Sequence, residues 1–414
     1  MNPYILILGC FDTKGEIFSY LRDCLLAEGE RVVTMNTGIL GTTELFPVDI
    51  EANVVAEEGG ETLALLTQAN DRGRAVEVMG KGVARIMSML VSEGGIKAAI
   101  GMGGGGGTHI VLSALKQIPI GVPKLCLSTL AAKDLAVQTG GKDILLMPSI
   151  VDLAGLNNIS RTLIRQAAAA VTAMGNLSPI AAREVPGRIA ISMFGNTTAC
   201  VEQCGNLLRK LGYEVFEFHA NGIGGMTMES LIHEGAFDAV LDITTTELAD
   251  ELCGGICSAG VHRLEAAGEM GIPQVVVPGC LDMVNFGGQS SVPEKYRSRD
   301  LYSWAPDVTL MRTNRKENVQ LAHILTTRLN QASGPVAILL PLKGISQIDS
   351  LDGIFYRPEI NAELFSEIKR SAKESIKVQE VDLHINHPKF AEIAVKALLE
   401  TMEVFKMNQL KNKI

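Results

Sequence analysis

Residues 98–110 read AAIGMGGGGGTHI, and the five positions from Gly103 to Gly107 are all glycine. Glycine gives up more backbone freedom on folding than any other residue, so such a run is destabilising unless the backbone there does something that other residues prevent. The run follows an apolar segment of strand length, residues 97–101, and precedes a segment of helical period, residues 108–117. This order indicates a strand, a glycine loop and a helix of a parallel sheet.

The first half of the chain repeats this alternation of short apolar strands and longer helical segments, so we predict a parallel sheet there. The predicted strands are residues 4–8, 31–35, 97–101, 124–128 and 144–148, and the predicted helices lie near 15–28, 59–92, 108–117 and 158–174. Residues 176–187, NLSPIAAREVPG, carry two prolines, end on glycine and show no periodicity, which is typical of a domain linker.

The second half starts the alternation again. Its predicted strands are residues 188–194, 213–218, 237–243, 274–279, 308–312, 336–341 and 376–382, and its clearest helices are 318–331 and 388–406. A chain of 414 residues also exceeds the usual size of a single hydrophobic core. We therefore predict an α/β protein with two doubly wound parallel-sheet domains in tandem, residues 1–180 and 181–414.

Composition excludes several classes of protein. A net charge of −9 and the lack of a basic run argue against a nucleic-acid partner. The N-terminus has an apolar run of only five residues and no basic start, so we expect neither a signal peptide nor a membrane span. Eight cysteines without a C-x-x-C pair predict free thiols in a cytoplasmic protein. Cys200/Cys204 and Cys253/Cys257 have a spacing that would suit zinc, but small buried hydrophobic side chains give the same pattern.

The glycine run lies where ligands bind in open parallel sheets, at the end of a strand and the start of a helix. Its N–H groups can point into one concavity, and the helix N-terminus adds a partial positive charge. We therefore predict a phosphate cradle at Gly103–Gly107 and Thr108, with positive φ at Gly104 or Gly105. A purely structural loop is the alternative. NAD is disfavoured because no acidic residue follows about twenty positions on, and the Walker lysine is absent.

Two other strand ends in the first half carry polar residues. Asp12, Thr13 and Lys14 follow the first strand, so Lys14 could reach phosphate oxygens and Asp12 could hold Mg²⁺, although a simple helix cap has the same pattern. Ser128 and Thr129 end another strand. Arg72 and Arg74 suit either phosphate contact or, as we favour, a solvated helix surface. The predicted nucleotide-binding residues are Asp12, Thr13, Lys14, Gly103, Gly104, Gly105, Gly106, Gly107, Thr108, Ser128 and Thr129.

Strand ends in the second half are also rich in polar and glycine residues, more than turns require. We predict a second pocket there for a small metabolite. A lone histidine is usually structural, yet His219 lies in a loop of glycines and asparagines. The predicted catalytic residues are His219, Glu247 and Asp282, and the predicted substrate-binding residues are Gly195, Thr197, Thr198, Thr245, Thr246 and Asn285.

Long stretches of the chain resemble an uncharacterised bacterial protein family related to the tomato mosaic virus resistance protein. They include YILILGCFDTKGE, GMGGGGGT, DITTTELAD, GIPQVVVPGCLDMVNFG, VTLMRTN, LLPLKGISQID and HINHPKFAE, and the resemblance covers about residues 3–405. It implies two Rossmann-like subdomains, a resistance-protein-like ATP-binding domain and self-association into dimers. The chain departs from the family pattern at Trp304, Ala305, Asn196 and Asn221, which implies a different second ligand if those positions touch it.

Three functions fit these observations. The first is an ATP- and Mg²⁺-dependent enzyme acting on a small metabolite, with nucleotide on the first domain and substrate on the second. The second is a nucleotide-sensing or scaffold dimer without chemistry, because the sequence has no nucleophile elbow or other strong catalytic motif. The third is a dinucleotide-dependent oxidoreductase or isomerase, which the missing ribose-binding acid weakens.

Overall fold

The computed structural model describes residues 3–178 and 183–411, and the chain divides into two compact units, Met1–Ala181 and Ala182–Ile414. The predicted boundary between residues 180 and 181 lies outside the described residues, as does part of the predicted linker. In the part of the chain that the structure describes, no helix has the length and apolar character needed to span a bilayer.

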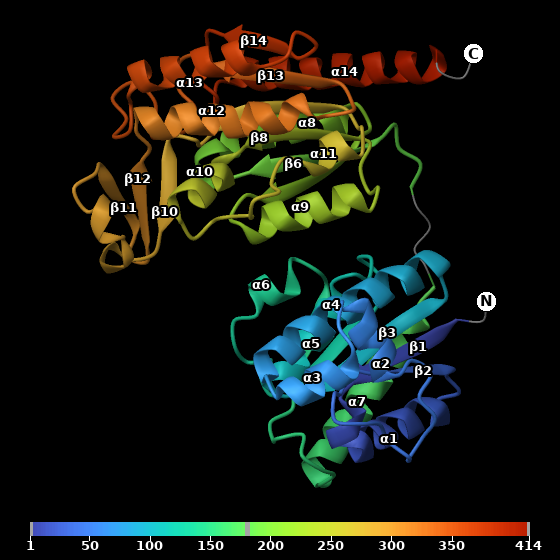
Figure 1. Ribbon diagram of the computed structural model, residues 1–414. Helices are drawn as coiled ribbons and strands as arrows, with labels where there is room; N and C mark the ends of the chain where they lie inside the picture. Colours follow the sequence, from blue (N-terminus) through green and yellow to red (C-terminus); the bar gives the residue numbers. More distant parts are fainter. Residues whose placement is uncertain (1–2, 179–182, 412–414) are drawn as a thin grey trace. The chain divides into compact units, whose positions relative to one another are not determined.

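The N-terminal unit is built on a parallel sheet, of which β1, β2 and β3 are labelled in Figure 1. The strand order is β2-β1-β3-β4-β5. All five strands lie within two residues of their predicted positions, because strands buried on both faces appear in the sequence as continuous apolar runs. The strands are β1 (Tyr4–Gly9), β2 (Val32–Asn36), β3 (Ile96–Gly103), β4 (Lys124–Ser128) and β5 (Ile144–Pro148).

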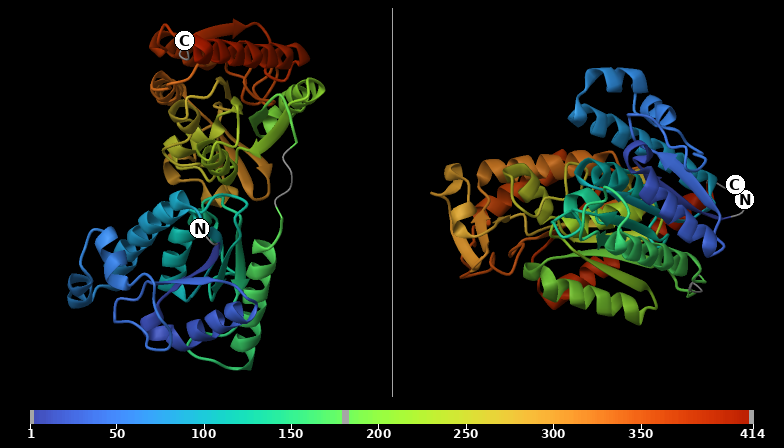
Figure 2. Two further views of the ribbon diagram at one scale, coloured as in Figure 1. Left: turned by 90° about the vertical axis from the view of Figure 1, so that its right-hand side faces the viewer. Right: turned by 90° about the horizontal axis from the view of Figure 1, so that it is seen from below.

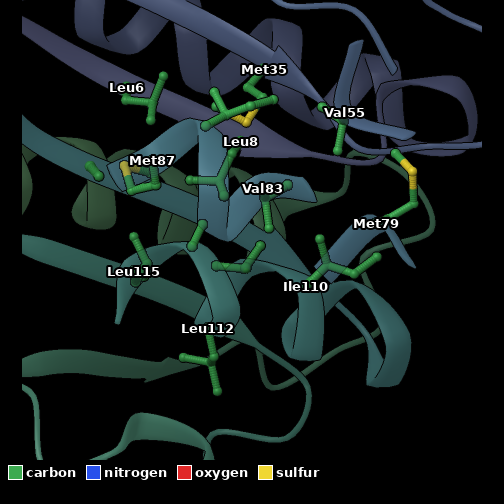
Figure 3. Close-up of a cluster of buried hydrophobic side chains, with 14 of the residues drawn as sticks. Leu6, Leu8, Met35, Val55, Met79, Val83, Met87, Ile110, Leu112 and Leu115 are labelled. Carbon is green, nitrogen blue, oxygen red and sulfur yellow. The ribbon is translucent and has the colours of Figure 1, made fainter. Parts of the chain in front are cut away.

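Helices cover both faces of this sheet. Leu6 and Leu8 of β1 pack against α4 and α5 (Figure 3), whereas Ile5 and Ile7 face α1 and α7. This alternation along one strand is why β1 is apolar at every position. The helices are α1 (Phe11–Ala27), α2 (Ala52–Glu58), α3 (Leu63–Ala69), α4 (Arg72–Glu93), α5 (Gly105–Leu115), α6 (Ala136–Thr139) and α7 (Asn158–Gly175).

The single helix predicted over residues 59–92 is wrong, because two helices, α3 and α4, occupy this region. Thr62 caps the start of α3 through its side chain, and Asp71 does the same for α4. Between them Asn70 adopts a left-handed conformation with φ of 48°, which ends α3. Helical periodicity continues through these caps, and the caps themselves mark the breaks.

The C-terminal unit repeats the same architecture with one more strand. Its six parallel strands have the order β14-β13-β9-β8-β6-β7. If the strands of each parallel sheet are numbered separately along the chain, both sheets have the order 2-1-3-4-5. The second sheet has a sixth strand next to the fifth. The strands are β6 (Arg188–Met193), β7 (Glu214–His219), β8 (Ala239–Thr244), β9 (Gln274–Gly279), β13 (Val336–Pro341) and β14 (Lys377–Val381).

Helices α8 and α14 cover one face of the second sheet, and the remaining helices of this unit pack on the other face or at its edges (Figure 1 and, from two further sides, Figure 2). Ile189 and Ile191 of β6 face α8 and α14, while Ala190 faces α9 and α11. The helices are α8 (Thr198–Lys210), α9 (Ile223–His233), α10 (Thr246–Cys253), α11 (Ala266–Glu269), α12 (Arg315–Asn330), α13 (Pro358–Ser371) and α14 (Pro388–Lys411), with short 3₁₀ turns η1 (Gly195–Thr197), η2 (Gln289–Ser291) and η3 (Glu294–Tyr296).

A small antiparallel sheet is inserted between β9 and β13. It contains β10 (Met283–Phe286), β11 (Leu301–Ala305) and β12 (Val308–Arg312) in the order β10-β12-β11. The strand predicted at residues 308–312 exists, but its place in the parallel series is wrong. The structure otherwise confirms the predicted α/β class, with two Rossmann-like parallel-sheet subdomains in tandem.

Each parallel sheet has a point where the chain reverses its direction of winding. It lies between β1 and β3 in the first sheet and between β6 and β8 in the second. Ligands of doubly wound folds bind beyond the carboxyl ends of the strands at such a point. The fold therefore directs attention to the loops that follow Gly9 and Gly103, and to those that follow Met193 and Thr244.

Candidate functional site

The glycine run passes from strand to helix without an intervening loop. β3 ends at Gly103, Gly104 precedes the helix with φ of −83°, and α5 begins at Gly105. The helix thus starts three residues earlier than predicted. The expectation of positive φ is wrong for this run, because its residues are in extended or right-handed helical conformations.

Steric demands of the fold account for only part of the run. A Cβ on Gly103 would lie 2.7 Å from the backbone of Gly107 and Thr108, so this position must be glycine. A Cβ on Gly104 would meet only the Thr129 hydroxyl at 3.8 Å, and one on Gly105 would meet nothing within 4 Å. Packing therefore does not explain why Gly104 and Gly105 lack side chains.

These glycines leave the start of α5 uncovered. Among the described residues, none accepts a hydrogen bond from the backbone N–H groups of Gly105, Gly106 or Gly107. The first N–H groups of a helix have no partner within the helix, and they carry its positive dipole end. Uncovered N–H groups at a helix start are the kind of donors that bind anions in proteins.

A cavity of about 380 Å³ lies at this edge of the N-terminal unit. The sequence-predicted residues in its wall are Asp12, Thr13, Gly106 and Gly107. The same wall includes the segment after β2, residues 37–40, and the start of α4. The structure thus brings the end of β1 and the glycine run to one cavity at the reversal point of the sheet.

Arg72 adds a cation to this cavity. Its guanidinium nitrogens Nη2 and Nε lie 3.7 and 3.8 Å from the place where a Cβ of Gly106 would be. Within the described ranges, no carboxylate forms an ion pair with Arg72. Arg74, by contrast, binds Glu61 at 2.7 Å on an exposed surface. A solvated helix surface was the environment that we expected for both arginines. The two neighbouring arginines therefore have different environments.

Asp12 and Lys14 contact neighbouring loops. The Asp12 carboxylate accepts the N–H of Thr13 at 2.6 Å and that of Leu40 at 2.9 Å. The Lys14 ammonium donates to the carbonyl of Leu153 at 2.6 Å, and Lys14 is not in the cavity wall. Asp12 thus joins the first turn of α1 to the loop after β2, and Lys14 holds the loop after β5.

The other predicted nucleotide-binding residues lie behind the glycine run. The Thr108 and Ser128 hydroxyls are buried and 2.6 Å apart, and Thr108 also donates to the carbonyl of Gly103. Thr129 lies next to Gly104. In the described parts of the chain, no group of three or more His, Cys, Asp or Glu side chains could hold a metal ion, and all eight cysteines are free thiols.

A second cavity of about 280 Å³ lies in the C-terminal unit, next to the reversal point of its sheet. Of the predicted residues, Gly195, His219 and Asn285 line it. Asn196 and Asn221, where the chain departs from the family pattern, line it too. Residues at the carboxyl ends of β6 and β7 thus line this cavity together with residues of the inserted antiparallel sheet.

The predicted threonines of this unit are bound to their own surroundings. Thr197 and Thr244 share a buried hydrogen bond of 2.7 Å, and Thr198 donates to the carbonyls of Phe194 and Gly195. Thr245 donates to the carbonyl of Val277 at 3.3 Å. The Thr246 hydroxyl is buried, and no described residue is its hydrogen-bond partner. None of the four is in the wall of the cavity.

Glu247 and Asp282 are buried without lining the cavity. Glu247 binds Arg263, which sequence reasoning missed because a lone arginine in a loop has no pattern of its own. Burial raises the pKa of Glu247. Asp282 accepts the Ser346 hydroxyl at 2.7 Å, and burial together with the charge of Asp349 raises the pKa of Asp282 to about 7.

Comparisons with known proteins cover both units. Residues 3–179 match the N-terminal domain of the uncharacterised protein family UPF0261, and residues 187–402 match its C-terminal domain. A UPF0261 protein of Clostridium tetani is 42% identical over 97% of this chain and 100% of its own length. One from Mesorhizobium japonicum is 43% identical over 96% of this chain and 98% of its own length.

A plant protein and two solved structures complete the comparison. The tomato ToMV resistance protein Tm-1 is 38% identical over 96% of this chain, which spans 56% of the tomato protein. A UDP-N-acetylglucosamine 2-epimerase from Rickettsia bellii and a MurG from Acinetobacter baumannii each align with a TM-score of 0.21, at 10% and 11% identity. The epimerase alignment covers 66% of this chain and 78% of the epimerase, and the MurG alignment covers 98% and 100%. These two likenesses are too weak to support an argument about function. The domain matches and the close relatives confirm the resemblance seen in the sequence: the chain belongs to the uncharacterised protein family UPF0261.

Proposed function

We propose that the N-terminal cavity binds the phosphate groups of a nucleotide, ATP together with Mg²⁺. One observation supports this most directly: Gly106 and Gly107, whose N–H groups have no partner among the described residues, line one cavity together with Arg72, whose guanidinium forms no ion pair there. Directed N–H donors and a planar cation are the groups that bind phosphate oxygens in proteins. The missing side chains at Gly104 and Gly105 leave room for a phosphate to approach the backbone.

Mg²⁺ would be bound jointly by the phosphates and the protein. The cavity wall contains two carboxylates, Asp12 and Asp71, and Asp71 already caps α4. Mg²⁺ typically keeps several waters and takes one or two carboxylates in addition to phosphate oxygens. Asp12 is therefore the proposed protein ligand, consistent with the lack of a larger acidic cluster in the described residues.

We further propose that the protein is a cytoplasmic homodimer that uses ATP to act on a small metabolite. His219 is the proposed catalytic residue with access to a cavity, while Glu247 and Asp282 would act from within the protein. That burial favours the alternative of a nucleotide-sensing dimer without chemistry. A dinucleotide-dependent oxidoreductase or isomerase still lacks an acidic residue for the ribose. Measuring ATP turnover against a metabolite panel separates the enzyme from the sensor.

Calorimetric titration tests the phosphate site. We expect ATP with Mg²⁺ to bind more tightly than AMP, because more phosphate oxygens meet the helix start and Arg72. Binding should also raise the melting temperature, since a ligand at 100 times its dissociation constant adds about 2.7 kcal/mol to the stability of the folded state. If neither ATP nor ADP produces heat or a thermal shift, the glycine run has no phosphate-binding role.

A further inference from the structure

We infer that the cavity of the C-terminal unit is a binding site for an uncharged cyclic molecule that has an apolar face and donates at least two hydrogen bonds. The cavity is lined by Phe194, Asn196, His219, Asn285 and Trp304, among others. The inference does not depend on nucleotide binding to the N-terminal unit, because every residue used belongs to the C-terminal unit.

Two asparagines in the wall have side-chain carbonyl oxygens that accept no hydrogen bond in the described structure. Asn196 and Asn285 are only 2% and 1% exposed, and in the described structure neither side-chain carbonyl has a hydrogen-bond partner. Asn285 donates through Nδ2 to the Asp250 carboxylate at 2.8 Å, which fixes the orientation of its amide and leaves Oδ1 as a free acceptor. Buried acceptors without a donor are costly, so a ligand that donates to both would stabilise the protein.

The charge around the cavity selects an uncharged ligand. Of the described residues in its wall, none is Lys, Arg, Asp or Glu. Burial, with the nearby charges of Asp250 and Glu247, raises the pKa of the Cys257 thiol to about 12, so this group is neutral near pH 7. A charged ligand would lose its water without gaining a counter-charge, which is strongly unfavourable.

Aromatic and aliphatic side chains form the rest of the wall. The rings of Phe194 and His219 are stacked with centroids 5.4 Å apart, and Trp304 presents a half-exposed indole. Val308 and Leu310 of β12 add aliphatic surface. Such walls bind flat or apolar faces, while a few polar groups fix the orientation. A nucleobase and a sugar ring both combine an apolar face with N–H or O–H donors.

The wall is fixed in place by contacts outside the cavity. The backbone carbonyl of Asn196 accepts the N–H of Gln347 at 3.0 Å and the side-chain amide of Asn386 at 2.9 Å. The Glu247 carboxylate accepts the N–H groups of Gly222 and Gly225, which hold the turn that follows His219. Preformed walls reduce the ordering cost of binding, as expected of a built site.

Trp304 is the only tryptophan of the chain, so its fluorescence reports on this cavity alone. The full-length protein, without nucleotide, is titrated with two sets of probes: nucleosides and nicotinamide in one arm, and neutral monosaccharides in the other. Benzoate and benzylamine serve as charged comparators. We expect a saturable change in Trp304 emission in one arm, and binding at least about tenfold weaker for the comparators. The responding arm identifies the ligand as base-like or sugar-like.

Two variants test whether the unpaired carbonyls bind the ligand. Asn196→Leu removes one acceptor. Among the described residues its side-chain amide donates only to the Met283 sulfur, so the fold should tolerate the change. Thr309→Val is the matched control, because it removes a buried unpartnered hydroxyl of β12 that is not in the cavity wall. We expect Asn196→Leu to weaken binding about tenfold and Thr309→Val to leave it unchanged.

Three results would overturn the inference: no saturable emission change in either arm, tighter binding of a charged comparator, or full affinity in Asn196→Leu. ATP titration of the same samples keeps the two proposals separate. Loss of the Trp304 response with intact ATP binding refutes only the second site, and the reverse result refutes only the phosphate site.

Discussion

Arg263 binds Glu247 in the interior of the C-terminal unit, with 2.6 Å between Nε and Oε2 and no exposed surface on either side chain. The same guanidinium donates to both oxygens of Asp242 and to Glu229. The second oxygen of Glu247 accepts the N–H groups of Gly222 and Gly225. This buried network therefore connects β8, α9 and α10 to the turn beside the C-terminal cavity.

Removing the cation of this network should destabilise the unit more than neutralising one of its acids. Arg263→Met leaves three carboxylates in the interior without their partner, and breaking a buried pair in this way costs about 3–5 kcal/mol. Glu247→Gln leaves Arg263 with Asp242 and Glu229, so we expect a smaller loss of about 1–3 kcal/mol. Urea unfolding followed by Trp304 emission reports the stability of this unit directly. A Glu247→Gln variant of wild-type stability that has lost enzymatic activity would instead make Glu247 catalytic.

Asp250 should make the stability of the C-terminal unit depend on pH. Burial raises the pKa of Asp250 to about 7, against about 3.9 for an unfolded chain. Between these values the folded protein binds a proton that the unfolded chain has released, so the contribution of Asp250 to stability falls as the pH rises. The slope is at most about 1.4 kcal/mol per pH unit, and the contribution is constant below pH 4 and above pH 7.

The variant Asp250→Asn isolates this effect, because its side chain can still accept the N–H of Cys257 or Asn285. Relative to the variant, the wild-type protein should lose stability from pH 4 to pH 7 and then no more. Urea midpoints measured for both proteins across this range decide the matter. Parallel curves would show that Asp250 has a normal pKa.

Most of the fold could be predicted because parallel strands are buried on both faces and leave continuous apolar runs such as YILIL and VAILLP. The strands β10 and β11 of the small antiparallel sheet lack such a run. β10, MVNF, is buried but has only four residues, one of them Asn285, and β11, LYSWA, is short and half-exposed.

The candidate sites could be predicted only where one segment contains the whole signal. Asp12, Gly106 and Gly107 follow strands directly, and parallel strands bring their carboxyl ends to one edge. Arg72 lies more than thirty residues before the glycine run, in a stretch typical of a solvated helix start. The side-chain carbonyls of Asn196 and Asn285 lack partners because no donor among the described residues lies within hydrogen-bond distance. A sequence pattern cannot predict this.

Substitutions in the glycine run should affect the stability of the fold and the binding of ATP separately. Gly103→Ala places a Cβ 2.7 Å from the backbone of α5, so we expect a loss of stability of more than about 1 kcal/mol. Gly105→Ala has space and a helical conformation, and should add about 0.5–1 kcal/mol of stability. If phosphate approaches this backbone, Gly105→Val should weaken ATP binding without unfolding the protein. Thermal melts and calorimetry measure the two effects separately, and normal ATP affinity in Gly105→Val would contradict the cradle.

Arg72 and Lys14 are the two cations that could meet phosphate, and their surroundings predict different outcomes. Arg72 has no ion-pair partner among the described residues and lies over Gly106, whereas the Lys14 ammonium already donates to the Leu153 carbonyl at 2.6 Å. Arg72→Ala should therefore weaken ATP binding by about 1.5–3 kcal/mol, the value of a hydrogen bond to a charged group, and weaken AMP binding less. The melting temperature of Arg72→Ala without ligand should not change, because an exposed unpaired side chain contributes little to stability.

Lys14→Ala should instead lower the melting temperature, since the loop after β5 loses its anchor, and keep ATP affinity within about twofold. Calorimetry at one low salt concentration compares the variants without differences in screening. Should Lys14→Ala prove as damaging to ATP binding as Arg72→Ala, the lysine must leave Leu153 when nucleotide binds, and the phosphates would then lie nearer to α1 than to α4.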